Sequence, residues 1–248
     1  MKNKTIEYIL SSYPRSRPPI TEAHKKVFVD EYQLNRSGKG ILFGAIELLE
    51  SWQHRKISGL RNQKSILEIG AGSLNHVPYE PEAKYYDCIE PFSELYKESP
   101  YLKEIRNLYA DIEDITDSLH YQRIISVAVL EHLLDLPNVV ARSGLLLSPD
   151  GVFQASIPSE GGFIWGLSWR LSTGIAYRLR TGLDYKSIMR HEHVNSAHEI
   201  IEIIKYFFNT IKISRFPLPS SHLSFYTYIE ASSPNLERCN LFHDENFN

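Results

Sequence analysis

The sequence has little of what builds disulfide frameworks, zinc sites or membrane spans. Its 248 residues include only two cysteines, Cys88 and Cys239, without paired spacing. Two such cysteines suggest neither a disulfide framework nor a zinc site, and Cys88, inside an apolar run, is predicted to be a buried thiol. No stretch approaches the roughly 18 consecutive apolar residues of a transmembrane helix. We therefore expect no integral membrane association.

The sequence also lacks a strong excess of either charge. Lys and Arg number 27, Asp and Glu number 30, and the net charge is -3. Proteins that bind nucleic acid by neutralising many phosphates are typically basic, so no nucleic-acid partner is expected. Glu7 interrupts the N-terminal apolar run, which is too short for a signal peptide. A cytoplasmic protein is predicted.

Strand and helix patterns alternate from residue 64 onward. Short apolar segments predict strands at 64–70, 83–90, 104–110, 123–130 and 151–158. Helices are predicted after Gly72, at 91–98, around 114–120 and at 136–147. Strands that alternate with helices indicate a parallel sheet with helices on both faces.

The two ends of the chain differ from this α/β core, which we place at 64–232. Residues 1–63 predict an extended lead-in at 11–20, with three prolines, followed by a helical cap at 21–35 and 41–54. After the fifth strand, an insertion over about 159–195 precedes a helix at 197–208. Two further strand segments, 210–216 and 223–231, are joined by a short loop and favour an antiparallel hairpin. Residues 233–248 read as a polar tail.

A glycine turn follows the first predicted strand. Glu68 lies near the end of this strand, and Gly70 and Gly72 form the turn, where open α/β sheets bind ligands. Glycine lets a ligand approach the backbone closely. The dinucleotide fingerprint G-x-G-x-x-G would need a third glycine where Asn75 stands, which weakens a dinucleotide interpretation. An acid before the turn suits a cationic or hydroxyl-bearing ligand.

The segment LEIGAGS, residues 67–73, resembles the first motif of class I S-adenosylmethionine-dependent methyltransferases, in their type 11/12-like small-molecule branch. Three further resemblances follow in order: YADIEDI at 109–115, VAVLEHLLDLP at 127–137, and LLLSPDGVFQASIP at 145–158. The resemblance covers roughly residues 64–158. It implies an α/β, Rossmann-like, seven-stranded and mostly parallel doubly wound sheet. An antiparallel C-terminal hairpin, an N-terminal helical cap and a lid insertion after strand 5 complete the predicted fold.

The resemblance also implies a cofactor, S-adenosylmethionine, and residues that bind it. Glu68, Gly70 and Gly72 belong to the first motif. Glu90 lies about 20 residues beyond the turn, where an acid binds ribose hydroxyls in this architecture. Asp111 matches the position that contacts the adenine amino group, and Ile112 the position against the ring.

Methyl transfer from a sulfonium needs a base only if the acceptor must lose a proton. His132 follows the fourth strand, and His191 and His193 precede the helix at 197–208; neutral imidazole is the usual base near pH 7. We select His132 and His193 as the catalytic candidates. The position of a further metal-binding acid in ubiquinone-biosynthesis O-methyltransferases is Ala128 here, so no metal site is predicted.

The insertion gathers aromatic and basic residues and is interpreted as a substrate lid over the cofactor cleft. Aromatic rings can stack on a sugar, and arginines can bind a phosphate or carboxylate. The residues concerned are Trp165, Trp169 and Tyr177, with Arg170, Arg178 and Arg180. The chain also resembles methyltransferases of bacterial surface-polysaccharide loci. We therefore expect O-methylation of a small molecule or glycan intermediate, an acceptor with an anionic group.

Other interpretations stay open at this stage. The chain could be a methyltransferase-fold scaffold without turnover, because Leu74 and Gln122 depart from the usual motifs and no base is obvious. A less favoured alternative is an NAD-dependent oxidoreductase on the same layered sheet. The aromatic-rich N-terminal segments could form a homodimer interface.

Overall fold

The centre of the computed structural model, which describes residues 5–25, 27, 51–58, 64–170 and 174–247, is a seven-stranded sheet. The strand order is β3-β2-β1-β4-β5-β7-β6. The strands are β1 (Ser65–Ile69), β2 (Tyr85–Ile89), β3 (Asn107–Tyr109), β4 (Tyr121–Val127), β5 (Leu147–Pro158), β6 (Phe208–Pro217) and β7 (Ser224–Pro234). Strands β1 to β5 pair in parallel, and β7 pairs antiparallel with β5 and β6. The predicted mostly parallel sheet with an antiparallel C-terminal hairpin is confirmed.

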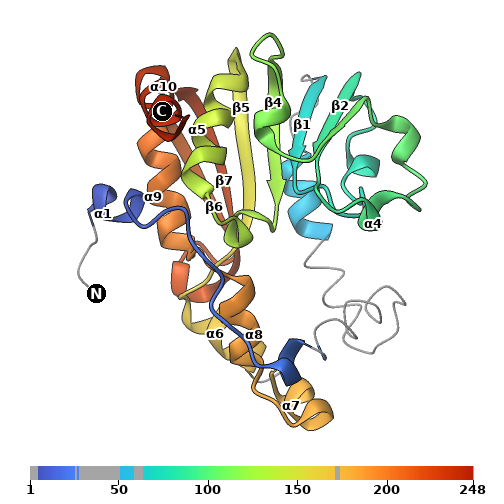
Figure 1. Cartoon of the computed structure of the whole chain (residues 1–248), viewed down its shortest axis with the longest axis vertical. Coiled ribbons are helices and arrows are strands. Elements are labelled where there is room, and N and C mark those ends of the chain that lie inside the picture. The colour runs from blue at the N-terminus through green and yellow to red at the C-terminus, as the bar shows by residue number, and fades with distance from the viewer. Residues whose placement is uncertain (1–4, 26, 28–50, 59–63, 171–173, 248) are drawn as a thin grey trace.

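Helices surround this sheet and extend beyond one of its edges (Figure 1). The α-helices are α1 (Ile6–Leu10), α4 (Ser93–Tyr96), α5 (Leu136–Leu146), α6 (Phe163–Trp169), α7 (Ile175–Thr181), α8 (Tyr185–Glu192), α9 (Ala197–Phe207) and α10 (Leu236–Phe247). Short 3-10 turns are η2 (Val77–Tyr79), η3 (Leu102–Glu104), η4 (Ile112–Asp114), η5 (Leu130–His132) and η7 (Ser221–Leu223). Residues 22–25 and 51–57 are also helical. No helix within these described stretches is long and apolar enough to cross a membrane.

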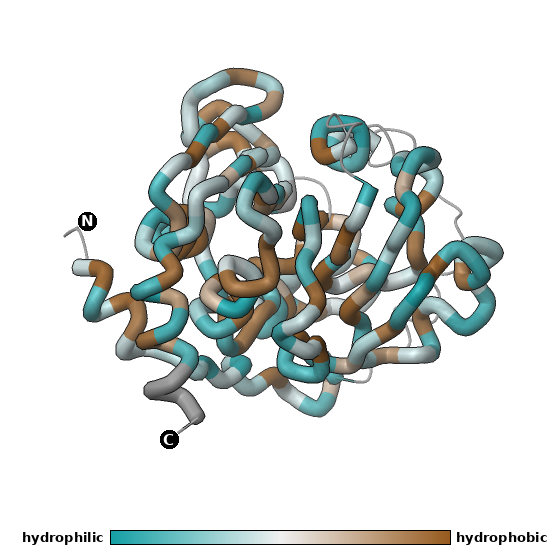
Figure 2. Tube along the Cα trace, turned by 90° about the horizontal axis from the view of Figure 1, so that it is seen from above, coloured by the Kyte–Doolittle hydropathy of each residue, from teal (hydrophilic) through white to brown (hydrophobic). Residues whose placement is uncertain are grey.

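Alternating side chains on the strands give the sheet two buried faces. On β1, Leu67 and Ile69 join the core that α5 and α9 cover, whereas Ile66 faces the opposite core with Ile57 and Cys88. Hydrophobic positions gather along the strands and the inner sides of the helices (Figure 2). Cys88 is fully buried, as the sequence predicted. Both faces are therefore covered, which leaves the strand ends as the place for ligands.

Local backbone conformation overturns two predicted helices. After Gly72 the chain forms turns and the 3-10 turn η2, because Gly72 and Leu74 both have left-handed φ angles, of 51° and 65°, that an α-helix excludes. Around 114–120 the structure has only η4 and irregular backbone. The prediction of a helix at each place was wrong. The predicted helix at 136–147 is confirmed as α5.

The chain ends also differ from expectation. Residues 233–248, predicted as a polar tail, instead contain α10, whose Cys239 is buried against the core that α5 and α9 cover. The predicted extended lead-in at 11–20 has no helix or strand beyond its first turn. Most of the helices predicted at 21–35 and 41–54 lies outside the described residues. The described parts of these two segments, 22–25, 27 and 51–54, are helical.

A fully buried arginine ties the helix at 51–57 to the sheet. Arg123 on β4 forms a two-pronged ion pair with Glu80, with Nη1–Oε2 and Nη2–Oε1 distances of 2.7 and 2.9 Å. Its Nη2 also donates to the carbonyl of Ile57 at 2.7 Å, and its Nε donates to Gln154 at 2.9 Å. Such a pair is costly to break from one side, because the partner is left charged and buried.

We predict that Arg123→Met lowers the free energy of unfolding by about 3–5 kcal/mol, since Glu80 then lacks its cation. Glu80→Gln should also destabilise, but the double variant should lose clearly less than the sum of the two single losses. Urea unfolding of the four proteins measures this coupling. Additive losses would show that the two side chains act independently.

Candidate active site at the carboxyl edge of the sheet

The glycine turn at the end of β1 needs its two glycines for different reasons. Gly70 has a φ of 70°, and a Cβ there would lie 2.5 Å from the side chain of Val129. Gly72 has a φ of 51°, but a Cβ there would meet nothing within 4 Å. Gly70 therefore permits close packing against the loop after β4. Gly72 faces open space that a ligand can occupy.

Leu74 takes the left-handed conformation without being a glycine. Its φ is 65°, and its side chain is fully buried in the core that contains Val77 and Ile66. A left-handed non-glycine residue costs roughly 1–2 kcal/mol, which the burial of a leucine side chain offsets. The leucine that departs from the usual glycine motif thus keeps the turn's backbone shape.

Glu90 links the turn to the end of β2. Its Oε2 accepts a hydrogen bond from the backbone N–H of Gly72 at 2.9 Å, and its Oε1 accepts one from Phe92 at 3.0 Å. The Glu90 backbone N–H donates to the carbonyl of Tyr109 on β3. The carboxylate is therefore fixed at the carboxyl edge, and each oxygen keeps capacity to accept another donor such as a hydroxyl.

The other predicted cofactor residues lie around this centre. Glu68 is buried behind the turn, where its Oε2 accepts from Tyr86 at 2.8 Å and burial raises its pKa. Asp111, beyond the end of β3, is exposed and caps η4 by accepting from the backbone of Glu113 at 3.0 Å. Ile112 is buried in the core. The structure thus joins Gly70, Gly72 and Glu90 directly and places Asp111 at the neighbouring strand end.

Both candidate catalytic histidines meet at the same edge. His132 ends η5, just after β4, and His193 follows α8; their rings contact edge to face with centroids 4.8 Å apart. The Nδ1 of His132 lies 2.9 Å from the carbonyl of Glu192, whereas His191 bonds through Nδ1 to the carbonyl of Pro18. The two selected histidines thus contact each other, whereas the ring of His191 bonds to the N-terminal segment.

The two imidazoles differ in charge because their surroundings differ. Burial, with the nearby His193, lowers the pKa of His132 to about 4. Burial also acts to lower the pKa of His193, but its hydrogen bond with the Glu160 carboxylate outweighs that effect and raises the pKa above its ordinary value. His132 is therefore neutral near pH 7. His193 is the stronger base of the pair.

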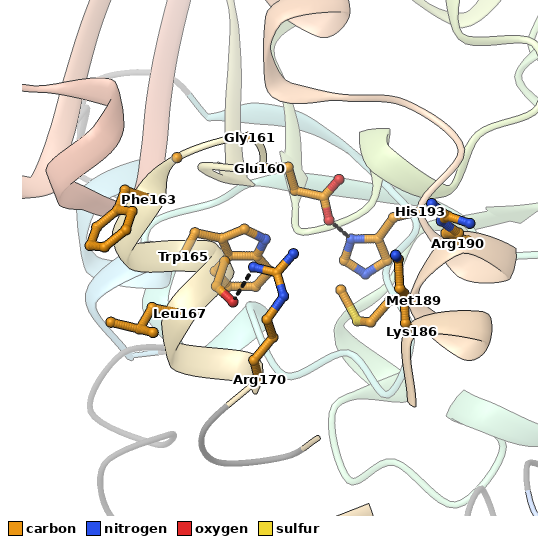
Figure 3. A pocket seen from close by; sticks show the side chains of 12 residues that line it. Glu160, Gly161, Phe163, Trp165, Leu167, Arg170, Lys186, Met189, Arg190 and His193 are labelled. Atoms are coloured by element: carbon orange, nitrogen blue, oxygen red, sulfur yellow. Dashed lines mark hydrogen bonds and ion pairs between the residues drawn. The ribbon is translucent and has the colours of Figure 1, made fainter. Parts of the chain in front are cut away.

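A pocket of about 530 Å³ opens beside His193, between α6 and α8 (Figure 3). Glu160 and His193 close one side of it, as Figure 3 shows. Other lining residues are Trp165, Leu167, Arg170, Lys186, Met189 and Arg190. Trp165 and Arg170 were predicted from the sequence, but Glu160, Lys186 and Arg190 were not. The spacing of Lys186 and Arg190 at i and i+4 would place them on one face of a helix.

The remaining insertion residues have other places. Arg178 and Arg180 lie on α7 and do not line this pocket. Tyr177 on α7 is buried and contacts the ring of Tyr185. The side chain of Trp169 falls outside the described part of the structure. Of the six aromatic and basic residues singled out from the sequence, Trp165 and Arg170 reach the pocket.

The N-terminal lead-in crosses the insertion and holds the histidine segments (Figure 1). Arg17 donates to the carbonyls of His191 at 3.0 Å, Glu192 at 3.2 Å and His132 at 3.4 Å. Arg15 pairs with Glu199 on α9 at 3.0 Å. A single guanidinium, that of Arg17, therefore joins the loop after β4 to the end of α8.

The described residues contain no group of three or more His, Cys, Asp or Glu side chains arranged to hold a metal ion. Ala128 follows β4 directly and has a left-handed φ of 53°. The chemistry available at this edge comes from the backbone turn, Glu90, the histidine pair and the pocket.

Comparisons with known proteins identify the fold. No protein-family model matches the sequence, and no curated protein matches it. Among solved structures, an S-adenosylmethionine-dependent methyltransferase from Archaeoglobus fulgidus is 12% identical, with 82% of this chain and 99% of that chain covered and a TM-score of 0.56. One from Thermotoga maritima is 16% identical, with 82% and 95% covered and a TM-score of 0.54. The plantazolicin methyltransferase BpumL, solved with S-adenosylhomocysteine, is 12% identical, with 92% and 95% covered and a TM-score of 0.53. The chain has the class I S-adenosylmethionine-dependent methyltransferase fold.

Glu131, buried beside the histidine pair, should make stability depend on pH. Burial raises its pKa from 4.5 to about 7, against the opposing effect of His193. Between pH 4.5 and about 7, the Glu131 carboxyl keeps its proton in the folded state but has lost it in the unfolded state. The stabilisation is therefore complete below pH 4.5 and is lost as the pH rises through 7.

Glu131→Gln has no such proton to lose, so we predict that it gains stability relative to the unsubstituted protein between pH 5 and about pH 7.5. Urea unfolding of both proteins across this range gives the difference. A constant difference at all pH values would show that Glu131 does not titrate in this range.

Proposed function

We propose that this protein is a methyltransferase that uses S-adenosylmethionine at the carboxyl edge of β1 and β2. The observation that carries the proposal is the pairing of an open glycine, Gly72, with the carboxylate of Glu90. The open space above Gly72 suits the close approach of a ligand to the backbone. The free acceptor capacity of Glu90 suits the hydroxyl groups of a ribose. The shared fold supports the same interpretation.

When bound, S-adenosylmethionine supplies a sulfonium methyl group for in-line displacement by an acceptor atom. The residues that we propose for binding are those of the turn, Gly70 and Gly72, with Glu90 at the ribose. Asp111 and Ile112 stay predictions for the adenine, and Glu68 supports the turn from behind through its bond with Tyr86. Placing the acceptor close to the methyl carbon supplies much of the acceleration in such a displacement.

We infer that the acceptor binds in the pocket between α6 and α8 and is methylated on oxygen. A hydroxyl acceptor must lose its proton, and His193 lines this pocket. With Nδ1 bonded to Glu160, the Nε2 of His193 is the nitrogen that can receive that proton. His132, neutral near pH 7, packs against this ring and limits its orientation. The pocket's Trp165 offers a surface on which a sugar ring can stack.

Four expectations from the sequence stay predictions: a glycan intermediate as acceptor, a cytoplasmic location, a role in polysaccharide biosynthesis and a homodimer. The aromatic and basic lining of the pocket supports a sugar-like acceptor. A scaffold without turnover and an NAD-dependent oxidoreductase are the competing interpretations. Ligand binding separates the oxidoreductase from the methyltransferase, and methyl transfer to an acceptor separates the methyltransferase from the scaffold.

We predict that Gly72→Ala abolishes binding of S-adenosylmethionine and S-adenosylhomocysteine and costs little more than about 1–2 kcal/mol of stability. Its added Cβ meets only the open space of the ligand site, so the folding cost comes from the left-handed backbone alone. Gly70→Ala should instead destabilise strongly, because its Cβ collides with Val129. Calorimetric titration and thermal unfolding give both quantities.

Glu90→Ala and NAD complete this experiment. Glu90→Ala should weaken binding of both sulfur ligands by at least about tenfold through loss of the ribose contact, and NAD should give no heat. A folded protein that binds neither sulfur ligand would remove the methyltransferase proposal. Binding of NAD alone would favour the oxidoreductase, and binding of the sulfur ligands without methyl transfer to any acceptor would favour the scaffold.

The Glu160 and His193 pair predicts how turnover depends on pH. A base must be neutral to accept a proton, so the rate should rise with pH through the raised pKa of His193. Glu160→Gln removes the negative charge beside the ring and should move this rise to lower pH by roughly one unit or more. Proton NMR titration of His193 should show the same shift. An unchanged profile would exclude His193 as the base.

A further inference from the structure

The pocket between α6 and α8 is positively charged. Three basic side chains line it, Arg170, Lys186 and Arg190, against the single carboxylate of Glu160. The Glu160 carboxylate is already paired with His193. Within the described residues, neither Lys186 nor Arg190 has a carboxylate within ion-pair distance. Among the residues that the structure describes, no ion pair therefore neutralises these two side chains.

The positions of the basic groups make them converge on one space. Lys186 and Arg190 stand at i and i+4 on α8 and so share a face of that helix. Arg170 follows α6 on the opposite wall, and Figure 3 shows its side chain between the two helices. The guanidinium donates to the carbonyl of Gly166 at 2.8 Å, and a Cβ at Gly166 would lie 2.7 Å from its Nη1. The glycine thus leaves room for the arginine to lie over α6.

The remaining wall of the pocket is apolar. Trp165 and Leu167 on α6 and Met189 on α8 contribute to it. The Trp165 ring contacts Tyr226 on β7, with centroids 6.4 Å apart, so the indole is supported from the sheet side. This combination suits a ligand with a ring or alkyl portion and an anionic group at one end.

We propose that this pocket binds the methyl acceptor through an anionic group, a phosphate or a carboxylate, held by Lys186 and Arg190 with Arg170 opposite. This inference rests on the proposed function, because it names the acceptor class of the same site. Glu160 and His193 mark the end of the pocket where the reacting hydroxyl lies. The anionic group therefore shares the pocket with the reacting hydroxyl, and neutral sugars without it bind poorly.

The test is calorimetric titration of the full chain with pyrophosphate and, separately, with glucuronate; glucose is the neutral control. We expect at least one anion to bind, with an affinity that falls as NaCl is raised. The variant Lys186→Gln/Arg190→Gln should bind that anion at least about tenfold more weakly, the equivalent of one lost charge-assisted hydrogen bond. Binding of pyrophosphate would identify phosphate as the recognised group, and binding of glucuronate would identify carboxylate.

The matched control is Lys64→Gln/Lys103→Gln, which makes the same change in net charge at two exposed residues outside the pocket. It should retain the affinity within about twofold. Equal weakening by both double variants, or no heat from either anion, would overturn the inference. Titration of S-adenosylhomocysteine into the same samples separates the two proposals. If S-adenosylhomocysteine binds and neither anion does, only the anionic acceptor is refuted. If an anion binds and S-adenosylhomocysteine does not, the methyltransferase is refuted.

Discussion

The contact between Gly70 and Val129 is the constraint on which the candidate site depends. With no side chain at Gly70, the loop after β4 lies directly against the turn after β1. That loop continues into η5 and His132, whose ring contacts His193 at the end of the insertion. One absent Cβ therefore brings the turn proposed to bind the cofactor next to the segments proposed to bind the acceptor. Two ligands that react must be held with their reacting atoms close together and correctly oriented.

The charged groups of the site differ between the glycine turn and the pocket. On the side of the turn, the fixed groups are the Glu90 carboxylate and the backbone N–H groups that bond to it. On the side of the pocket, basic side chains are in excess and one carboxylate is paired with His193. Beside the histidine pair lies Glu131, buried and with its pKa raised to about 7. The two halves can thus favour ligands of different charge without competing for them.

The sequence was sufficient for the sheet because its strands are short, apolar and bounded by turns. It was sufficient for the central motif too: Gly70, Gly72 and Glu90 lie together as their positions after parallel strands require. It failed after Gly72, where the left-handed Leu74 stops a helix that residue types alone would allow. Local propensity does not indicate that backbone angle. The left-handed conformation is tolerated because burial of the Leu74 side chain offsets its cost.

The residues that line the pocket were predicted less well, because their positions also depend on backbone turns and on contacts between distant parts of the chain. Basic residues of the insertion looked equivalent in the sequence, but a left-handed turn at Gly182, with a φ of 72°, ends α7 before α8 begins. That turn separates Arg178 and Arg180 from Lys186 and Arg190. Glu160 and His193 are far apart in the chain, and no local pattern indicates that they pair.

The contacts of Arg17 have a consequence for the order in which the chain can fold. The residues whose carbonyls it binds, His132, His191 and Glu192, are synthesised long after Arg17 itself. During translation the contact with His132 can therefore form before the insertion has emerged, whereas the contacts with His191 and Glu192 can form only afterwards. The complete set of Arg17 contacts thus depends on segments that lie 115 and 174 residues further along the chain.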